Sequence, residues 1–460
     1  MRWHNILRDI LAIGVILAGI LVSPPAVSGQ GDSVPSSAAT RLDPRVVWLR
    51  EHAIQLRSVS PADEDWTDLE PLKDVLGEAS IVMLGEESHG DGATFLAKTR
   101  LIKFLHQEMG FDVLAFESGL YDIWKAWEAL ARGEEPSRAI ARGLFSLWAG
   151  SEQVEPLVEY LAMHAKSKRP LELAGFDIQM SGTASRESLV ADLTHLLNQL
   201  GIGQQHAPDW GHFTSLLLDL ATKDFVRGTK PLPPRLAQDR FAAVIGWMQA
   251  TLSRQDIPIE ARTKAFWRQV LESLDAYAAM VWLVDPSDLR PRPDDAEIRE
   301  AQMTRNLLWL ARMRYPGKRI VVWAATSHIA RGLSELESGI VDIQTIYDQV
   351  PTLGERVWKA LGTEVYSLGF TAYEGTAGMF FQSPRDIGRS SDGSLEELMT
   401  RAGLEFAVLD FRNPAANGDW LRQPIVARPL GYREMYADWT RFLDGMVFTK
   451  RMTPSTRVER

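Results

Sequence analysis

Hydrophobic residues along the chain fall into two alternating kinds of run. Ser80–Leu84 and Phe111–Phe116 are short and almost wholly apolar, which is typical of strands buried on both faces of a sheet. Between them, Gly92–Met109 carries apolar residues at helical spacing, and Gly110 is placed to end that helix in the left-handed conformation. This strand–helix–strand order predicts an α/β fold, with a mainly parallel sheet and covering helices.

The same pattern continues on both sides of this unit. A helix is expected over residues 44–57, where Asp43 can cap and Pro44 suits the first helical position. Further strands are predicted at Leu171–Phe176, Arg319–Ala324, Glu364–Phe370 and Phe406–Phe411.

A long helical stretch separates two of these strands. Its predicted helices are Arg186–Leu200, Pro234–Ser253, Ile259–Val284 and Asp294–Tyr315. The stretch is rich in large aromatic residues, which either pack an all-α subdomain or line an apolar pocket beneath a helical cap. The chain is therefore expected to have a first core part at 44–180, a large all-α, lid-like insertion at 181–295, and a second core part at 296–460.

The N-terminus resembles an export signal. Ile10–Val22 is an uncharged apolar run, and Ala26-Val27-Ser28 supplies small residues at a cleavage site. We expect a signal peptide at 1–28, a flexible leader at 29–43, and a periplasmic or secreted protein that keeps no stable membrane insertion after cleavage. An uncleaved anchor is the alternative, although this run is short for a span of roughly 20 residues.

Composition narrows the possible functions. The formal net charge of −10 argues against nucleic acid as a partner, because such binding needs a basic surface. The chain contains no cysteine, which excludes disulfides, thiolate nucleophiles and Cys-ligated metals. A monomer is expected.

Reactive residues follow the predicted strands at their carboxyl ends. Glu86 and His89 come after the first strand, Glu117 after the second, Asp177 after the third and His328 shortly after the fourth. Ligands bind at this edge of open α/β sheets, so a polar site is expected there. Singly, each residue is as well explained by a helix cap or a structural hydrogen bond.

The loop Gly85–Gly90 suggests a chemistry for this site. Its glycines permit a tight backbone that directs Glu86 and His89 to one side. An imidazole is suited to activate water as a general base, with a carboxylate fixing its tautomer. No G-x-S-x-G elbow, H-E-x-x-H helix, P-loop or dinucleotide-binding glycine motif is present, and Ser88 is a poor candidate nucleophile.

At these positions the chain resembles the erythromycin esterase family. The resemblance is carried by the G-E-x-[ST]-H-G element at Gly85–Gly90 and the F-E at Phe116-Glu117. It continues through Gly175–Asp177, Arg299–Asn306 and the H-[IV]-A-R within Val321–Gly332. It covers most of the predicted sheet and is weak in the helical region and the C-terminus.

The resemblance implies that water hydrolyses a carboxylic ester or lactone without a metal or other cofactor. A macrolide, whose lactone ring would be opened, is one candidate substrate. By position, His89 matches the general base, and Glu86, Glu117 and His328 match supporting catalytic residues. Lys98 falls where the family places a basic residue. We expect Lys98, Asp177 and Arg299 to bind substrate, although Lys98 also fits a solvated helix face.

Three departures from the family pattern concern the rim of the site. Ala93 stands where many members carry Glu, Ala325-Thr326 replaces a common His-Asn, and Lys98 cannot give the bidentate grip of Arg. They put macrolide specificity in doubt more than hydrolysis.

The sequence thus predicts a hydrolase of a small-molecule ester or lactone. Two alternatives stay open. One is a metal-dependent hydrolase using the same His and Glu side chains. The other is an envelope-polysaccharide role without esterase activity.

Overall fold

A computed structural model describes residues 43–256, 259–285, 287–288, 290, 292–339 and 341–459. The predicted signal peptide and residues 29–42 of the predicted leader lie outside these residues. Within the described ranges, no helix combines the length and the apolar character needed to span a bilayer.

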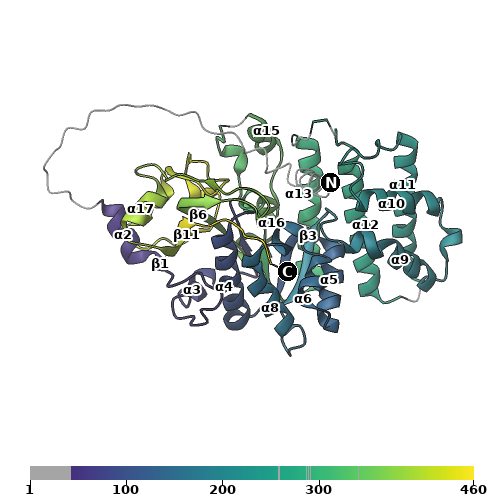
Figure 1. The fold of residues 1–460 in the computed structure, drawn as a ribbon, viewed down its shortest axis with the longest axis horizontal. Coiled ribbons are helices and arrows are strands. Elements are labelled where there is room, and N and C mark those ends of the chain that lie inside the picture. The colour runs from purple at the N-terminus through teal and green to yellow at the C-terminus, as the bar shows by residue number, and fades with distance from the viewer. Residues whose placement is uncertain are drawn as a thin grey trace.

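One large sheet organises the described chain (Figure 1). Its strand order is β1-β8-β11-β6-β2-β5-β3-β4, with β7 paired to β6. The run from β11 to β4 is parallel throughout, and β8 and β1 continue it antiparallel. The strands of this sheet are β1 (Ile54–Gln55), β2 (Ile81–Leu84), β3 (Phe111–Gly119), β4 (Glu172–Asp177), β5 (Arg319–Trp323), β6 (Val365–Ala377), β7 (Arg385–Asp386), β8 (Phe406–Asp410) and β11 (Gly445–Met452). The mainly parallel α/β fold is confirmed.

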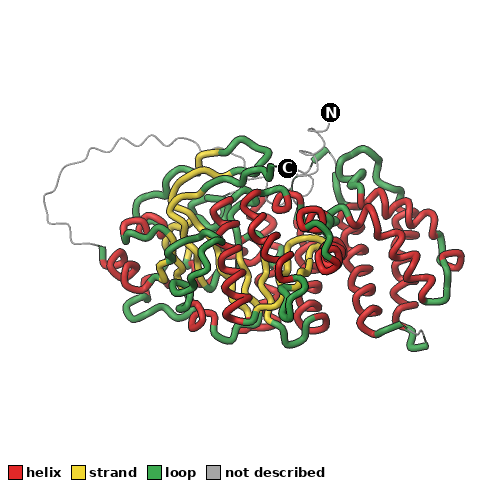
Figure 2. The backbone as a smooth tube through the Cα atoms, turned by 60° about the horizontal axis from the view of Figure 1, so that its bottom comes forward, coloured by secondary structure: helices red, strands yellow, loops and turns green. Residues whose placement is uncertain are grey.

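Helices cover the sheet and extend beyond one end of it. Figure 2 shows the strands in one part of the molecule and helices alone at the other end. The α-helices are α2 (Pro44–His52), α3 (Leu72–Leu76), α4 (Gly92–Met109), α5 (Leu120–Arg132), α6 (Pro136–Ala141), α7 (Ser146–Ala149), α8 (Glu155–His164), α9 (Ala184–Gln199), α10 (Trp210–Ala221), α11 (Arg235–Ser253), α12 (Ala261–Val281), α13 (Pro293–Trp309), α14 (Thr326–Ile329), α15 (Val341–Gln349), α16 (Leu353–Leu361) and α17 (Leu395–Arg401). A small separate hairpin pairs β9 (Ile425–Ala427) with β10 (Met435–Ala437).

The best-predicted unit is the one that carries the first site residues. Strand β2 is buried at every position, and α4 has the predicted bounds. Gly110 ends α4 with φ 72° and ψ 28°, the left-handed conformation that glycine adopts without steric cost. Asp43 caps α2 by accepting from Arg45 N, as predicted, but α2 ends at His52, earlier than expected.

Strand β11 was not predicted, although it lies between β6 and β8 inside the sheet. Its first half, Gly445–Thr449, is buried, and its second half carries Lys450 and Arg451 at the surface. The apolar run is therefore short, and the hydrophobic pattern alone does not distinguish a strand here from an irregular C-terminal segment. Helix α13 also differs, because it ends at Trp309 and continues as a π-helical turn over Leu310–Arg314.

Helices α9 to α12 lie together at one end of the molecule, beyond α5 and α13 (Figure 1). They share a hydrophobic core, so the prediction of aromatic packing is confirmed for several side chains: Phe213, Phe225, Phe241, Phe266, Trp267 and Tyr277. Trp267 lies against Tyr121 and Trp124 of α5, which joins this core to the α/β part. The boundaries 181–295 and a lid function for these helices remain predictions.

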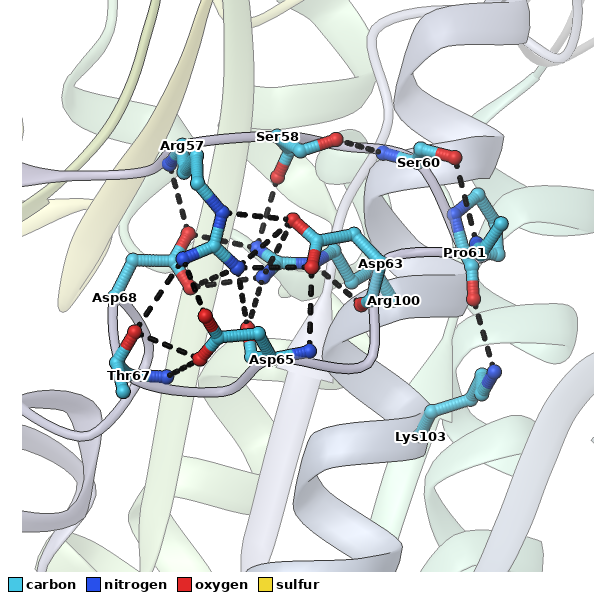
Figure 3. A network of polar contacts seen from close by, with 11 residues as sticks. Arg57, Ser58, Ser60, Pro61, Asp63, Asp65, Thr67, Asp68, Arg100 and Lys103 are labelled. Atoms are coloured by element: carbon cyan, nitrogen blue, oxygen red, sulfur yellow. Dashed lines mark hydrogen bonds and ion pairs between the residues drawn. The ribbon is translucent and has the colours of Figure 1, made fainter.

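A buried arginine fixes the other side of α4. Figure 3 shows Arg100 beneath the segment that follows β1, where it donates to the carbonyls of Ser58 and Asp65 and to both Asp68 oxygens at 2.8–2.9 Å. Lys103 donates to the carbonyl of Pro61 at 2.9 Å. These hydrogen bonds tie α4 to the segment that follows β1. The first turns of α4 face the carboxyl ends of the strands.

Candidate active site

The strands that carry the predicted site residues are neighbours in the sheet. Their order is β2-β5-β3-β4, although β5 comes last of the four along the chain. Because all of them are parallel, Glu86, His328, Glu117 and Asp177 meet at one edge.

His89 is held in place by Glu86. Nδ1 of the ring lies 2.7 Å from Glu86 Oε1, and the same oxygen accepts from Trp148 Nε1 at 3.1 Å. The rings of Trp148 and Phe145 stand edge-on to the imidazole, with centroids 5.2 and 6.3 Å away. His89 is 8% exposed, and within the described residues only its Nδ1 is hydrogen-bonded. A carboxylate on Nδ1 places the basic lone pair on Nε2.

Lys98 completes this group from α4. Its ammonium lies 2.6 Å from Glu86 Oε2 and 3.2 Å from the carbonyl oxygen of Ala324, and it stands over the ring of Trp323. The side chain is fully buried, which excludes the solvated helix face. Burial lowers the pKa of Lys98, and the Glu86 carboxylate opposes that shift.

The two loop glycines are required for space rather than for an unusual φ angle. Neither has a positive φ. A Cβ on Gly85 would lie 2.5 Å from Thr326 Oγ1, and one on Gly90 would lie 2.4 Å from the backbone carbon of Gly378. The predicted tight backbone is therefore a close approach of three segments. The Ser88 hydroxyl donates to Asp91 Oδ1 at 2.9 Å, and not to His89.

Glu117 is surrounded by donors. Arg299 donates to its Oε1 at 2.8 Å, and Ala325 N donates to Oε2 at 2.9 Å. Arg299 also binds both oxygens of Asp177, at 3.1 and 2.8 Å. Burial alone would raise the pKa of Glu117, but His328 and Arg299 hold it well below its ordinary value. Asp177 and Arg299 are themselves buried, so in this structure their contacts position Glu117.

His328 lies between two carboxylates. Its Nε2 is 3.2 Å from Glu117 Oε1, and its Nδ1 is hydrogen-bonded to Glu300 Oε1. Burial works against the charged form, yet Glu300 and Glu117 raise the pKa of His328 to about 10. The ring is therefore an imidazolium at neutral pH.

The segment after β5 joins the two groups. The carbonyl oxygen of Ala324 accepts from Lys98, Ala325 N donates to Glu117, and Thr326 N donates to the Glu86 carbonyl oxygen at 2.9 Å. All seven residues predicted for the site thus belong to one buried network. Ala325 takes part through its backbone, so the departure from the family pattern at its side chain leaves this contact intact.

Two members of the network were not predicted. Trp148 lies on the short helix α7, and no pattern in the sequence connects it to Glu86. Glu300 follows Arg299 on α13, and its position beside a predicted site residue was the available signal. Ala93, the other departure, is buried in a mainly apolar cluster with Ala372, Ala377 and other residues.

The carboxylates of this network are already occupied. Both oxygens of Glu86 and both of Glu117 bind donors within the network. Throughout the described part of the chain, no group of three or more His, Asp or Glu side chains is arranged to hold a metal ion. The arrangement holds an imidazole in a fixed orientation within one network that also buries the ammonium of Lys98.

Comparison with known proteins finds a matching family model and related sequences. A family model described as erythromycin esterase matches residues 106–452, which include Glu117, Asp177, Arg299 and His328. The Bacillus subtilis protein named "Putative hydrolase YbfO" is 25% identical over 433 residues, covering 90% of this chain and 92% of that protein. Erythromycin esterase type II of Escherichia coli is 21% identical over 398 residues, covering 80% of this chain and 88% of that protein.

Solved structures share the fold. A succinoglycan biosynthesis protein superposes with a TM-score of 0.72 at 19% identity, covering 90% of this chain and 97% of that one. An erythromycin esterase mutant in its open conformation superposes with a TM-score of 0.65 at 14% identity, covering 87% of this chain and 98% of that one.

Proposed function

The chain belongs to the erythromycin esterase family, and we propose that it hydrolyses carboxylic esters or lactones with His89 as the general base. The family and the hydrolase relatives support the broader assignment of a hydrolase. The observation that carries the finer proposal is the buried contact of 2.7 Å between Glu86 Oε1 and His89 Nδ1.

In the proposed reaction, Nε2 of His89 takes a proton from water while the water oxygen bonds to the ester carbonyl carbon. The bond from that carbon to the alcohol oxygen then breaks, and the leaving alkoxide takes the proton from the His89 imidazolium, which restores the base. Glu86 stabilises the imidazolium that forms on His89, and Lys98 holds Glu86 in place. Glu117 belongs to the same unit through Ala325 and Arg299.

His328 is proposed to act on the oxygen that gains charge. Its Nε2 faces Glu117 at 3.2 Å, while Nδ1 is held by Glu300. A substrate oxygen would therefore reach the Nε2 proton by replacing Glu117 as its acceptor. A raised pKa keeps that proton in place at neutral pH.

The proposal is tested by a screen of purified protein on lactones including macrolides, aryl esters and acylated sugars. Hydrolysis of at least one class that is lost in His89→Asn supports the proposal. Absence of hydrolysis across the whole screen would contradict it and favour the envelope-polysaccharide role. Because the chain departs from the family pattern at Ala93 and Ala325-Thr326, macrolides are the class that we least expect it to hydrolyse.

We also propose that the protein is exported, shortened by about 28 residues as its small-residue cleavage site indicates, and monomeric. The intact mass of protein recovered from the periplasm or medium tests the cleavage, and light scattering tests the monomer. A full-length protein in the membrane fraction would instead support an uncleaved anchor.

A further inference from the structure

Residues 453–458, here called the strap, run along the carboxyl edge of the sheet. They follow β11, which ends at this edge because it is parallel to β6 and β2. The strap makes isolated antiparallel bridges with two other segments, one between Pro454 and Asp91 and one between Arg457 and Ser151. It lies beyond residues 106–452, which the family model matches, so the family match assigns no role to it.

One side of the strap holds the backbone that follows His89. The amide of Ser455 donates to the carbonyl oxygen of Gly90 at 2.8 Å, and the amide of Gly92 donates to the carbonyl oxygen of Thr453 at 2.8 Å. Ser455 is 4% exposed, so the first of these bonds is buried. Because Gly90 directly follows His89, the strap limits the movement of the residue that carries the proposed base.

The other side of the strap holds the segment that follows Trp148. The amide of Val458 donates to the carbonyl oxygen of Gly150 at 3.1 Å. The hydroxyl of Ser455 donates to the hydroxyl oxygen of Ser151 at 2.9 Å, and both side chains are buried. Gly150 lies two positions after Trp148, so the strap ties the segment of this ring to the segment of His89.

The spacing of these two segments matters to one carboxylate oxygen. Glu86 Oε1 lies 2.7 Å from His89 Nδ1 and accepts from Trp148 Nε1 at 3.1 Å. Such bonds form over a narrow range of distances, about 2.7–3.2 Å. Both rings therefore reach the same oxygen only while their segments keep this spacing, and the strap joins the same two segments through their backbones.

We infer that the strap is a positioning element for His89 and that the amide of Ser455 is its central contact. The strap fixes the spacing at which Glu86 binds both rings, and thereby the direction in which His89 Nε2 points. It acts through the backbone next to His89 and not on the substrate. This inference rests on the proposed function, in which His89 is the general base.

Ser455→Pro tests the inference, because it removes the amide proton that Gly90 accepts. The bridge with Asp91 already holds Pro454 in the extended conformation that a residue before proline prefers. Ser455→Pro should lower kcat by roughly 10–100-fold and change KM by less than about twofold, because a slightly misplaced catalytic group slows the reaction without weakening substrate binding. Ser455→Ala is the matched control, which keeps the amide and should keep most of the wild-type kcat.

The orientation of the ring is measured separately by NMR on protein labelled with ¹⁵N-histidine. The ¹⁵N shifts of His89, read through its carbon-bound protons and assigned with His89→Asn, report which ring nitrogen carries the proton. The proton should be on Nδ1 in the wild type and in Ser455→Ala, and should be partly lost from Nδ1 in Ser455→Pro. A strap that only stabilises the fold would lower the Tm of Ser455→Pro and leave kcat and the ¹⁵N shifts as in the wild type. That result would overturn the inference, as would a fall in kcat with unchanged shifts.

Gly92→Ala is a second variant, which decides the question if Ser455→Pro does not fold. A Cβ on Gly92 would lie 2.4 Å from the carbonyl oxygen of Pro454, so it displaces the strap from the other side. Gly92→Ala should change kcat and the His89 shifts in the same direction as Ser455→Pro, and wild-type values would overturn the inference. Gly246→Ala on α11 is its control, because a Cβ there meets nothing within 4 Å, and it should leave both measurements unchanged.

Failure of the proposed function gives a different result. If the wild type hydrolyses no ester in the screen, ester hydrolysis is contradicted, and the ¹⁵N shifts alone decide the role of the strap. Loss of the Nδ1 proton of His89 in Ser455→Pro but not in Ser455→Ala then supports the strap as a positioning element. Unchanged shifts in Ser455→Pro overturn it.

Discussion

Nδ1 of His89 and Oε1 of Glu86 lie 2.7 Å apart in a buried contact, and this fixes which nitrogen of the ring is left for chemistry. Glu86 is in turn fixed by Lys98 and Trp148. The orientation of the imidazole therefore depends on these two contacts as well as on its own contact with Glu86. In the proposed reaction, the ring is therefore already oriented when water binds.

His89→Asn should keep the fold and reduce turnover by roughly 10²–10⁴, the usual worth of positioned proton transfer. Steady-state kinetics on a substrate found in the screen, with circular dichroism for the fold, provide the measurement. His195→Asn, an exposed histidine on α9, is the control and should be fully active. An active His89→Asn protein would refute the base assignment.

Glu86→Gln should destabilise the protein by about 3–5 kcal/mol, because it leaves the fully buried ammonium of Lys98 without a counter-charge. Glu86→Gln combined with Lys98→Met should recover part of that loss. Urea unfolding of both single variants and the double variant measures the coupling. Glu172→Gln, which breaks a more exposed pair with Lys318, should cost about 0–1 kcal/mol. Additive effects at Glu86 and Lys98 would contradict the pairing.

The sequence allowed the strand-end residues to be predicted because position and chemistry coincide there. Glu86, Glu117, Asp177 and His328 each follow a short apolar run, and parallel strands bring their ends together whatever their separation along the chain. The periodicity of α4 was also sufficient to fix its bounds.

The hydrophobic pattern could not show which faces of the helices and strands pack against one another. Lys98 reads equally as a surface lysine until α4 is packed against the sheet. The contact of Trp148 with Glu86 joins residues 62 positions apart, and that of Glu300 with His328 joins residues 28 apart. Such contacts depend on tertiary packing, which leaves no period in a single sequence.

Chelators should leave the hydrolytic rate unchanged, because the oxygens of Glu86 and Glu117 are committed to protein donors. Activity measured before and after dialysis against EDTA provides the test. The metal-dependent alternative expects activity to vanish and to return with added metal. It also expects excess metal to restore Glu117→Gln partly. In the present proposal Glu117→Gln is not restored, and its effect is not additive with that of His89→Asn, since both act in one unit.

Arg100→Met should lower the free energy of unfolding by about 3–5 kcal/mol, since it removes the buried counter-charge of the Asp68 carboxylate, which then keeps, among the described residues, only the backbone N–H of Arg57 as a donor. Urea unfolding measures the loss. Arg57→Met removes a much more exposed guanidinium from the same segment and should cost about 0–1 kcal/mol. Equal losses in the two variants would mean that Arg100 does not stabilise the packing of this segment on α4 more than Arg57 does.

The last prediction concerns stability at alkaline pH. The pKa of His328 in the folded protein is about 10, well above the value of about 6.5 expected in an unfolded chain. A group that holds its proton more tightly when folded contributes stability that is complete below the unfolded pKa and is lost as pH rises through the folded one. The gap in unfolding free energy between the wild type and His328→Gln should therefore narrow from about pH 7 to pH 10. Lys98 and Glu87 also have shifted pKa values, but they are present in both proteins and contribute to both curves. Glu117 loses one of its two cationic neighbours in His328→Gln and keeps Arg299, which still lowers its pKa. His195→Gln should show no such pH-dependent gap. Urea midpoints across this range decide the matter: a constant gap for His328→Gln would mean that the ring is neutral between Glu117 and Glu300, and it would then have no extra proton to offer a substrate oxygen.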